Sequence, residues 1–565
     1  MDTSYIRVAL VLPPTQSFFM PYSAPASLAA LLQQRFRAHT LVVDAGVDWL
    51  WDEVISVTGP APFAALKEER TYADLFALRE AYGEFEGALS QFCSPWSPEQ
   101  VLSSGRYSPP GRYETWQAVD ESLGKRGPFM FDRFFEQALI PKLRRFRAHI
   151  IGLSVPFDWM LWPAMRLLRW LRRSCPDVET ILGGPAIERL WQEKQREFFE
   201  IAQADWVAIG DGGQALCDLV EYSCRGVPPQ PGSALIRIPA DPIDRERRSI
   251  SVPDSGDNRT GRPIRLPAAG LAPDYTDLDL SRYLRPEPVL PIPASDGCFY
   301  GRCRFCSRQR SDQSVPYAEQ SPDDVASIMR RLRVETGAQQ FILAGDIFTH
   351  KFLLSLARAL VPEEGAFSWF CEASFKASMA ARLNPADCEL LYRGGCRLVL
   401  NGLESGSPRI RTLMDCPVSE EAYERTLIML VRAGIVPYVT IVFGYPGEGL
   451  QDLLQTIRFI QKHADHAVFA TSRFEIVPTT PLAEELLARR DARCTARPVL
   501  EGGMEYDGPE TLNSYDASVV LSKELGGIFG AFQEFYRHIP VMLQLLKKTA
   551  VATSDAREIT SATFS

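Results

Sequence analysis

Three cysteines with the spacing C-x4-C-x2-C stand at Cys298, Cys303 and Cys306. Thiolates at this density typically hold a metal ion or an iron–sulfur cluster. Three ligands are one fewer than a closed four-ligand site requires, so one coordination position can stay open for chemistry. A structural zinc site is the alternative, although zinc prefers four ligands and no further Cys or His lies near in the sequence. This loop is therefore the first candidate for a reactive centre.

The composition of the chain limits the classes of function. The 565 residues predict roughly two to four domains. A net charge of -9 disfavours a general nucleic-acid binder, which needs a basic surface. No apolar run reaches the roughly 18 residues of a membrane span, and the first residues lack the pattern of a signal peptide. We expect a cytoplasmic protein that binds neither nucleic acid nor membrane. Its remaining, scattered cysteines are expected to be buried as small hydrophobic side chains.

Residues 1–225 alternate between apolar runs and helical periodicity, which predicts a doubly wound, Rossmann-like α/β domain. We expect strands within residues 5–12, 41–44, 149–154, 180–185 and 205–213. An insertion at about 48–145, rich in aromatic residues, interrupts the alternation, and its aromatic side chains are interpreted as core. A helix over 131–140 is expected to end or kink at Pro141.

Polar and glycine-rich loops follow the strands of this first domain. In open parallel sheets the edge formed by the carboxyl ends of the strands binds ligands. Glycines there allow a nucleotide-like or tetrapyrrole ligand to approach the backbone closely, although tight turns alone also explain them. The residues of this predicted edge are Pro14, Thr15, Gln16, Ser154, Val155, Gly183, Gly184, Pro185, Gly210, Asp211 and Gly212.

The second half of the chain predicts a partial (βα)6 TIM-type barrel over 286–490, after a linker at 226–285 that contains a short edge strand at 234–238. We expect six strands within 288–292, 340–343, 368–372, 397–400, 437–443 and 467–478. The cysteine loop, Asp346, Glu404 and Glu448 then fall at the carboxyl ends of strands, where such barrels carry their chemistry. Residues 491–565 are expected to form a mainly helical segment, with an amphipathic helix in 517–550 and a tail.

Several motifs resemble one known superfamily. The cysteine loop, the run Gly-Leu-Glu-Ser-Gly-Ser at 402–407 and the run Phe-Gly-Tyr-Pro-Gly-Glu at 443–448 resemble the radical S-adenosylmethionine (SAM) enzymes. The first domain, with Gly-Gly-Pro at 183–185 and Gly-Asp-Gly-Gly at 210–213, is similar to the cobalamin-binding domain that precedes the radical domain in one branch. Two features depart from the family pattern. The first cysteine gap holds four residues instead of three, and the Asp-x-His-x-x-Gly signature that supplies a cobalt-ligating histidine is absent.

The resemblance implies three cofactors: a [4Fe–4S] cluster, SAM and cobalamin. It places the cluster on Cys298, Cys303 and Cys306, and cobalamin at the predicted edge of the first domain. It places SAM near Phe305, Gly345, Asp346, Glu404, Ser405, Thr440 and Arg473. Asp346 and Glu448 have helix capping as an alternative role, and Arg473 has a structural ion pair.

The function that the resemblance implies is C-methylation of an unactivated carbon in a natural product or peptide. A small-molecule or peptide substrate and an external electron donor would be the partners. Cyclisation or rearrangement with the same cofactors is the first alternative, and a non-catalytic cobalamin- or metal-binding sensor is the second.

Overall fold

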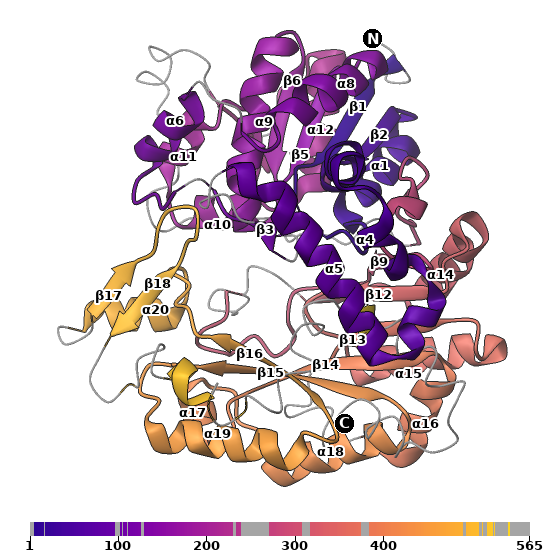
Figure 1. Ribbon diagram of the computed structural model, residues 1–565, viewed down its shortest axis with the longest axis vertical. Coiled ribbons are helices and arrows are strands. Elements are labelled where there is room, and N and C mark those ends of the chain that lie inside the picture. Colours follow the sequence, from indigo (N-terminus) through magenta and orange to yellow (C-terminus); the bar gives the residue numbers. More distant parts are fainter. Residues whose placement is uncertain are drawn as a thin grey trace.

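The computed structural model places two α/β domains one above the other (Figure 1). It describes residues 5–15, 17–96, 102–103, 106–109, 111–125, 129–229, 233–238, 270–307, 317–373, 383–489, 493–507, 511, 517–521, 523, 525 and 541–542. No helix within these residues is both long and apolar enough to cross a membrane.

The first domain contains a six-stranded sheet in the order β2-β1-β5-β6-β7-β8. Its strands are β1 (Arg7–Leu12), β2 (His39–Asp44), β5 (Ile150–Ser154), β6 (Glu179–Gly183), β7 (Trp206–Ala208) and β8 (Leu235–Arg237). All neighbours pair in parallel except β7 and β8, which are antiparallel. The predicted edge strand at 234–238 is therefore present. It belongs to the first domain's sheet rather than to a free linker.

Helices cover both faces of this sheet, as a buried parallel sheet requires. One face carries α1 (Ser23–Phe36) and α12 (Gly212–Arg225), which share a core with β1 through Ala29, Leu32 and Leu216. The other face carries α9 (Leu161–Ser174), α10 (Pro185–Gln192) and α11 (Arg196–Ile201). The doubly wound prediction is confirmed, because helices pack on both faces of the mainly parallel sheet.

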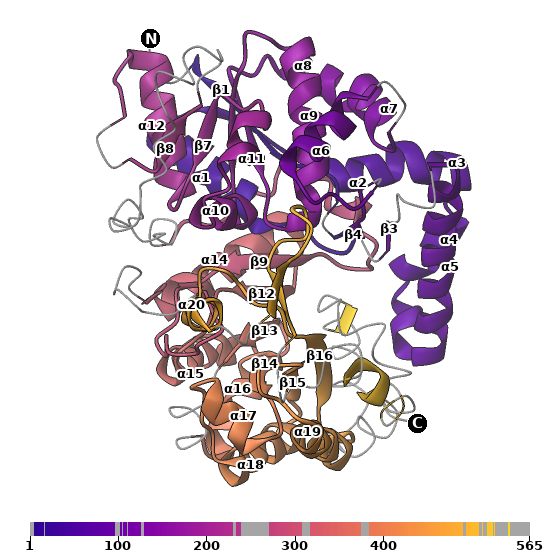
Figure 2. The ribbon, with the colours of Figure 1, turned by 90° about the vertical axis from the view of Figure 1, so that its left-hand side faces the viewer.

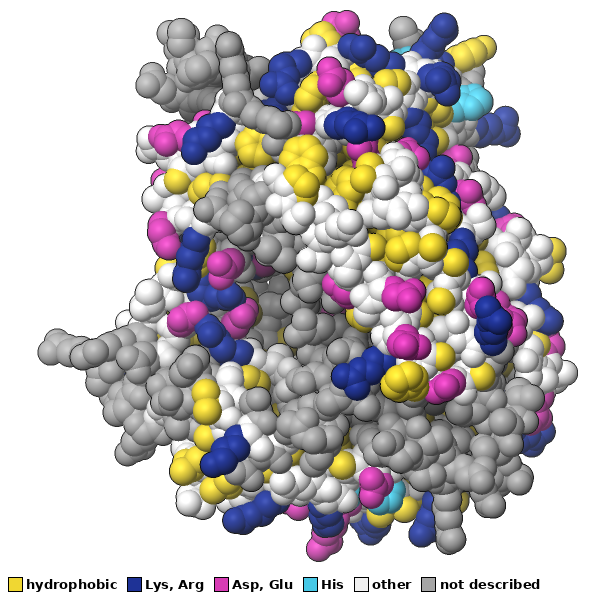
Figure 3. Space-filling view, in the orientation of Figure 1, with side chains coloured by type: hydrophobic (Ala, Val, Ile, Leu, Met, Phe, Trp, Pro, Cys, Tyr) yellow, Lys and Arg dark blue, Asp and Glu magenta, His cyan; other side chains and the backbone are white. Residues whose placement is uncertain are grey.

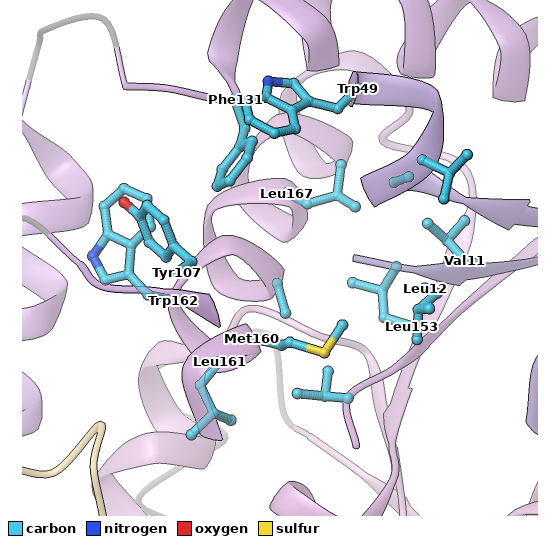
Figure 4. Packing of buried hydrophobic residues seen from close by; sticks show 14 of the residues in the cluster. Val11, Leu12, Trp49, Tyr107, Phe131, Leu153, Met160, Leu161, Trp162 and Leu167 are labelled. Carbon is cyan, nitrogen blue, oxygen red and sulfur yellow. The ribbon is translucent and has the colours of Figure 1, made fainter. Parts of the chain in front are cut away.

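The predicted insertion is largely helical and its aromatic residues extend the core. It contains α2 (Ala45–Trp49), η2 (Leu50–Ile55), α3 (Ser56–Thr58), α4 (Ala61–Ala64), α5 (Leu75–Cys93), α6 (Trp116–Gly124), α7 (Asp132–Phe134), η6 (Phe135–Leu139) and α8 (Ile140–Phe146), with short 3-10 turns and the strand pair β3 (Leu102–Ser103) and β4 (Arg106–Tyr107). Figure 4 shows Trp49 and Phe131 packed together, with Tyr107 against Trp162; the ring centroids lie 5.1 Å and 5.7 Å apart respectively. These contacts match the interpretation as core.

The helix over 131–140, which was expected to end or kink at Pro141, does not end there, because helical structure continues to Phe146. Phe135–Leu139 form a π-helical turn, η6. Pro141 lies in the first turn of the α-helix that follows, α8. A proline is tolerated at such a junction, because the missing N–H has no regular α-helical partner there.

The second domain contains six parallel strands in the order β16-β15-β14-β13-β12-β9. They are β9 (Val289–Pro293), β12 (Gln340–Ala344), β13 (Ser368–Glu372), β14 (Cys396–Glu404), β15 (Val436–Phe443) and β16 (Val468–Arg473). The helices are α14 (Pro322–Thr336), α15 (His350–Leu360), α16 (Pro385–Arg393), α17 (Pro408–Leu413), α18 (Glu420–Arg432), α19 (Leu450–His463) and α20 (Pro481–Ala488). The six βα units predicted from the sequence are confirmed.

The segment expected to be mainly helical begins instead with a β-hairpin. Strands β17 (Arg493–Ala496) and β18 (Met504–Asp507) pair antiparallel, and Met504 also pairs with Ile476 beyond β16. The hairpin loop reaches the first domain (Figure 2), where the Val499 N–H donates to the Tyr113 carbonyl at 2.9 Å and Leu500 is buried in the core. Apart from a few positions, the predicted helix at 517–550 lies outside the described residues.

Residues 270–285 join the domains through buried contacts. The Tyr283 hydroxyl donates to Asp44 at 2.9 Å in the first domain, and the Tyr275 hydroxyl donates to the Pro291 carbonyl at 2.5 Å in the second. Burial raises the pKa of Asp44 to about 7. This part of the predicted linker is therefore packed on both domains.

Candidate functional site

The cysteine loop follows β9 at the carboxyl edge of the second sheet. The short strands β10 (Ser295–Asp296) and β11 (Ala318–Glu319) pair at its entry. Cys298, Cys303 and Cys306 are half-buried, and the Cys306 N–H donates to the Cys303 carbonyl at 3.1 Å. The loop thus lies at the edge where a parallel barrel carries its chemistry, as predicted.

Gly345 and Asp346, at the end of β12, hold the entry to this loop. A Cβ atom on Gly345 would lie 2.9 Å from the Ser295 carbonyl oxygen, so only glycine fits. The Asp346 carboxylate accepts a hydrogen bond from the Gly297 N–H at 2.8 Å. The helix-capping alternative for Asp346 is wrong, because Thr349 caps α15.

Glu404 and Thr440 lie beside each other on neighbouring strands. Glu404 ends β14 with a φ of +68°, and the register between β14 and β15 shifts between Gly402 and Glu404. Gly402 pairs with the half-buried Thr440. Because a β-bulge redirects the side chains that follow it, Glu404 leaves the regular alternation of the strand.

Ser405 and Arg473 are engaged within the protein. The Ser405 hydroxyl is fully buried, 3.2 Å from the hydroxyl of Thr456 on α19. The Arg473 guanidinium forms an ion pair with Glu505 on the hairpin, which is the structural alternative for this residue. Contacts of these two side chains with SAM stay a prediction, and the observed partners would have to be displaced.

Phe305 and Glu448 lie near the last two strand ends. Phe305 packs against Tyr445 and Phe474, with ring centroids 6.4 Å and 6.1 Å away. Glu448 is 1% exposed and accepts a hydrogen bond from the Gly444 N–H at 2.5 Å. Burial raises its pKa to about 7. Gly449 is the N-cap of α19, so the helix-capping alternative for Glu448 is wrong.

A cavity of about 800 Å³ opens at the carboxyl edge of the first sheet. Seven of the predicted edge residues line it: Ser154, Gly183, Gly184, Pro185, Gly210, Asp211 and Gly212. Gly184 has a φ of +117°, and a Cβ atom there would lie 2.7 Å from the Val155 carbonyl oxygen. The cavity continues between α1 and α12, where Leu28 and Leu216 line it.

Three further residues predicted for this edge, Pro14, Thr15 and Val155, do not line the cavity. Thr15 is fully buried, and its carbonyl accepts a hydrogen bond from the Trp159 indole N–H at 3.1 Å. Val155 is buried in the core. Gln16, the remaining residue predicted for this edge, lies outside the described residues.

The cavity also has walls that the sequence analysis missed. Tyr22, Leu31 and Arg35 come from α1 or its start, and Glu188, Arg189 and Gln192 come from α10. The positions 28, 31 and 35 repeat at helical spacing, which was the available signal. Pro293, Ser307, Val477 and Thr479 come from the second domain, and nothing in the local sequence indicates that they face the first.

The donor set of the cysteine loop fits a [4Fe–4S] cluster. Among the described side chains, no three His, Cys, Asp or Glu residues converge closely enough for a single metal ion. A cubane cluster binds each thiolate through a different iron, so three half-buried thiols on one loop need not meet at a point. The cavity of the first domain reaches Ser307, directly after Cys306.

Comparisons with known proteins agree with this architecture. Residues 292–460 match the family model of the Radical SAM superfamily. An uncharacterised methyltransferase of Pyrococcus horikoshii is 22% identical over 58% of this chain and 67% of its own length. Among solved structures, the radical SAM methyltransferase TsrM from Kitasatospora setae, with cobalamin and a [4Fe–4S] cluster bound, superposes with a TM-score of 0.55. The two sequences are 14% identical, and the superposition covers 97% of this chain and 100% of the TsrM chain.

The cobalamin-dependent SAM radical enzyme OxsB gives a TM-score of 0.58 at 13% identity, over 99% of this chain and 74% of that chain. At these identities the likeness shows the fold, and the family model identifies the second domain. The chain therefore carries a radical SAM domain over residues 292–460, within a two-domain fold that it shares with TsrM and OxsB.

Proposed function

We propose that this enzyme is a cobalamin-dependent radical SAM methyltransferase that acts on a carbon atom of a natural product or peptide. One observation carries the proposal: the cavity lined by the glycine loops of the first domain extends to Ser307, next to Cys306 in the second. A ligand of the first sheet and a cluster on the cysteine loop would therefore face a common space. The names of the Pyrococcus relative and of TsrM also support methyl transfer.

The first domain would hold cobalamin through its backbone. Gly152, Gly183, Gly184 and Gly210 line the cavity, so main chain rather than side chains would face a large ring there. Apolar side chains such as Leu28 and Leu31 would contact the part of the ligand in the slot between α1 and α12. The described cavity lining contains no histidine, which agrees with the missing cobalt-ligating signature.

The second domain would hold the cluster and SAM. Cys298, Cys303 and Cys306 would bind three irons. Asp346, after β12, and Glu404, at the end of β14, would face SAM from two strand ends of the same sheet edge. When bound, the cluster, SAM and cobalamin supply an electron, a carbon radical and a methyl group. The protein would position these groups and exclude water, and an external electron donor would supply the electron to the cluster.

Anaerobic reconstitution tests the proposal. The purified protein is supplied with iron, sulfide and hydroxocobalamin, then with SAM and a strong reductant. Bound corrinoid is measured by its visible absorption, and nucleoside products are measured by mass spectrometry. Corrinoid binding together with reductive SAM cleavage is expected. Iron and sulfide uptake without corrinoid would refute the methyltransferase proposal but not the radical chemistry. Absence of SAM cleavage would favour the sensor alternative.

A cavity-filling variant sharpens the test. Leu28→Trp places a large ring in the slot, because Leu28 lines the cavity and is only partly buried. It should abolish corrinoid binding and leave iron uptake unchanged. Val334→Trp is the matched control, since Val334 is 87% exposed on α14. Equal corrinoid binding by both variants would place the ligand elsewhere.

Mass spectrometry of candidate substrates identifies the product. A gain of one CH2 in a substrate encoded or made by neighbouring genes indicates methylation. Loss of two hydrogens indicates cyclisation instead, and would replace the methyltransferase proposal with the first alternative.

A further inference from the structure

We propose that Asp415 is a positioning residue for the cysteine loop, and that the additional residue between Cys298 and Cys303 exists to make this contact. The inference rests on the proposed function, because it concerns the loop that would bind the cluster. Asp415 follows α17, 113 residues after Arg302. Asp415 therefore lies outside the cysteine motif, and the spacing of the three cysteines does not indicate its role.

Two residues of the four-residue gap bind Asp415. The Tyr300 hydroxyl donates to the Asp415 main-chain carbonyl at 2.7 Å. The Arg302 guanidinium donates to both carboxylate oxygens, with the shortest distances at 3.0 Å and 3.3 Å. The Arg304 N–H, between the second and third cysteines, donates to the neighbouring Met414 carbonyl at 3.0 Å. One short segment therefore holds the loop at three points.

The backbone of both partners is shaped for this contact. Gly301, between Tyr300 and Arg302, has a φ of +57°, which turns the loop so that both flanking side chains reach Asp415. Asp415 itself has a φ of +50°, a conformation that Asp tolerates better than most residues. Its N–H donates to the Thr412 carbonyl at 3.1 Å, which fixes it to the end of α17.

The remaining residue of the gap anchors the opposite side. The Phe299 ring packs on edge against Tyr317 with centroids 5.2 Å apart. The Tyr317 hydroxyl bonds to Glu319, and Glu319 also accepts from the Thr349 N–H at 2.5 Å. The four residues Phe299–Arg302 thus supply one aromatic anchor, one turn and two contacts to Asp415. A three-residue gap would lack one of these.

The apoprotein gives the first test. Asp415→Gly removes the carboxylate without straining the left-handed backbone, and Asp415→Asn keeps an acceptor there. The rate of anaerobic alkylation of the three loop cysteines is measured by mass spectrometry. For loss of an exposed bidentate pair we expect a rise of about two- to fivefold in Asp415→Gly, with Asp415→Asn in between. Glu364→Ala, which removes the similarly exposed partner of Arg393, is the control and should leave the rate unchanged.

The reconstituted protein gives the second test. The rate of iron loss to a chelator should rise by a similar factor in Asp415→Gly, and Tyr300→Phe combined with it should raise the rate further. The urea midpoint of unfolding should stay that of the wild type, which separates positioning from general destabilisation. Wild-type rates of alkylation and iron loss in Asp415→Gly would overturn the inference. If the wild-type protein takes up no iron and sulfide, the proposed function fails, and the alkylation rates still decide the role of Asp415.

Discussion

Replacing Glu448 by glutamine should remove a pH dependence from the stability of the second domain. Burial raises the pKa of Glu448 from 4.5 to about 7. The folded state therefore holds this proton more tightly than the unfolded state does. The stabilisation that this proton contributes is fully present at a pH below the pKa of Glu448 in the unfolded chain. It is lost as the pH rises through about 7. The shift corresponds to about 3 kcal/mol at full effect.

The assay is urea denaturation of the apoprotein at pH 5 and pH 8. The free energy of unfolding of the wild type should fall between these values, partly through Asp44, whose pKa burial also raises to about 7. Glu448→Gln should flatten the fall and be more stable than the wild type at pH 8 by about 1 to 3 kcal/mol, because glutamine keeps an acceptor for the Gly444 N–H without a buried charge. The exposed Glu389→Gln is the control. A variant that loses stability with pH as steeply as the wild type would refute the reasoning.

Two other substitutions test the packing around the site. Gly345→Ala should lower the free energy of unfolding by about 1 to 3 kcal/mol and impair iron uptake, because its Cβ would lie 2.9 Å from the Ser295 carbonyl oxygen. Gly212→Ala is the control, because no atom lies within 4 Å of the Cβ position there. Equal iron uptake and equal stability in the two variants would contradict the clash. Leu500→Ala should cost about 2 to 4 kcal/mol and expose the hairpin loop to limited proteolysis, since Leu500 is 6% exposed in the first core; Leu487→Ala, at a side chain 60% exposed, should change neither.

The strands of both sheets were predictable because parallel strands buried on both faces appear as continuous apolar runs. The strand expected at 340–343 spans Gln340–Ala344, for example. The strand expected at 397–400 is longer and ends at Glu404, because Asn401 and Gly402 resemble a loop while they pair with β15. The hairpin was missed although Gly502 and Gly503 are a turn signal, because its strands pack against distant segments.

At the candidate site, backbone roles were more predictable than side-chain roles. Gly184 and Gly345 are required by close approaches that follow from strand-end turns, so their type and position suffice. The directions of Ser405 and Arg473 depend on Thr456 and Glu505, which lie far along the chain. Local sequence does not encode such pairings. For the same reason, the residues that the second domain contributes to the cavity wall could not be predicted from the sequence.

The contacts between the domains bear directly on the proposed chemistry. A methyl donor on one sheet edge and a radical generated at the other must meet the same carbon, and a displacement of about one ångström costs on the order of a hundredfold in rate. Tyr275 and Tyr283 fix the domains on one side, and the hairpin fixes them through Val499 and Leu500 on the other. Loosening the hairpin should therefore reduce methyl transfer more than SAM cleavage, because cleavage needs the second domain alone. Equal loss of both activities in Leu500→Ala would show that the hairpin supports the barrel itself rather than the alignment of the two cofactor sites.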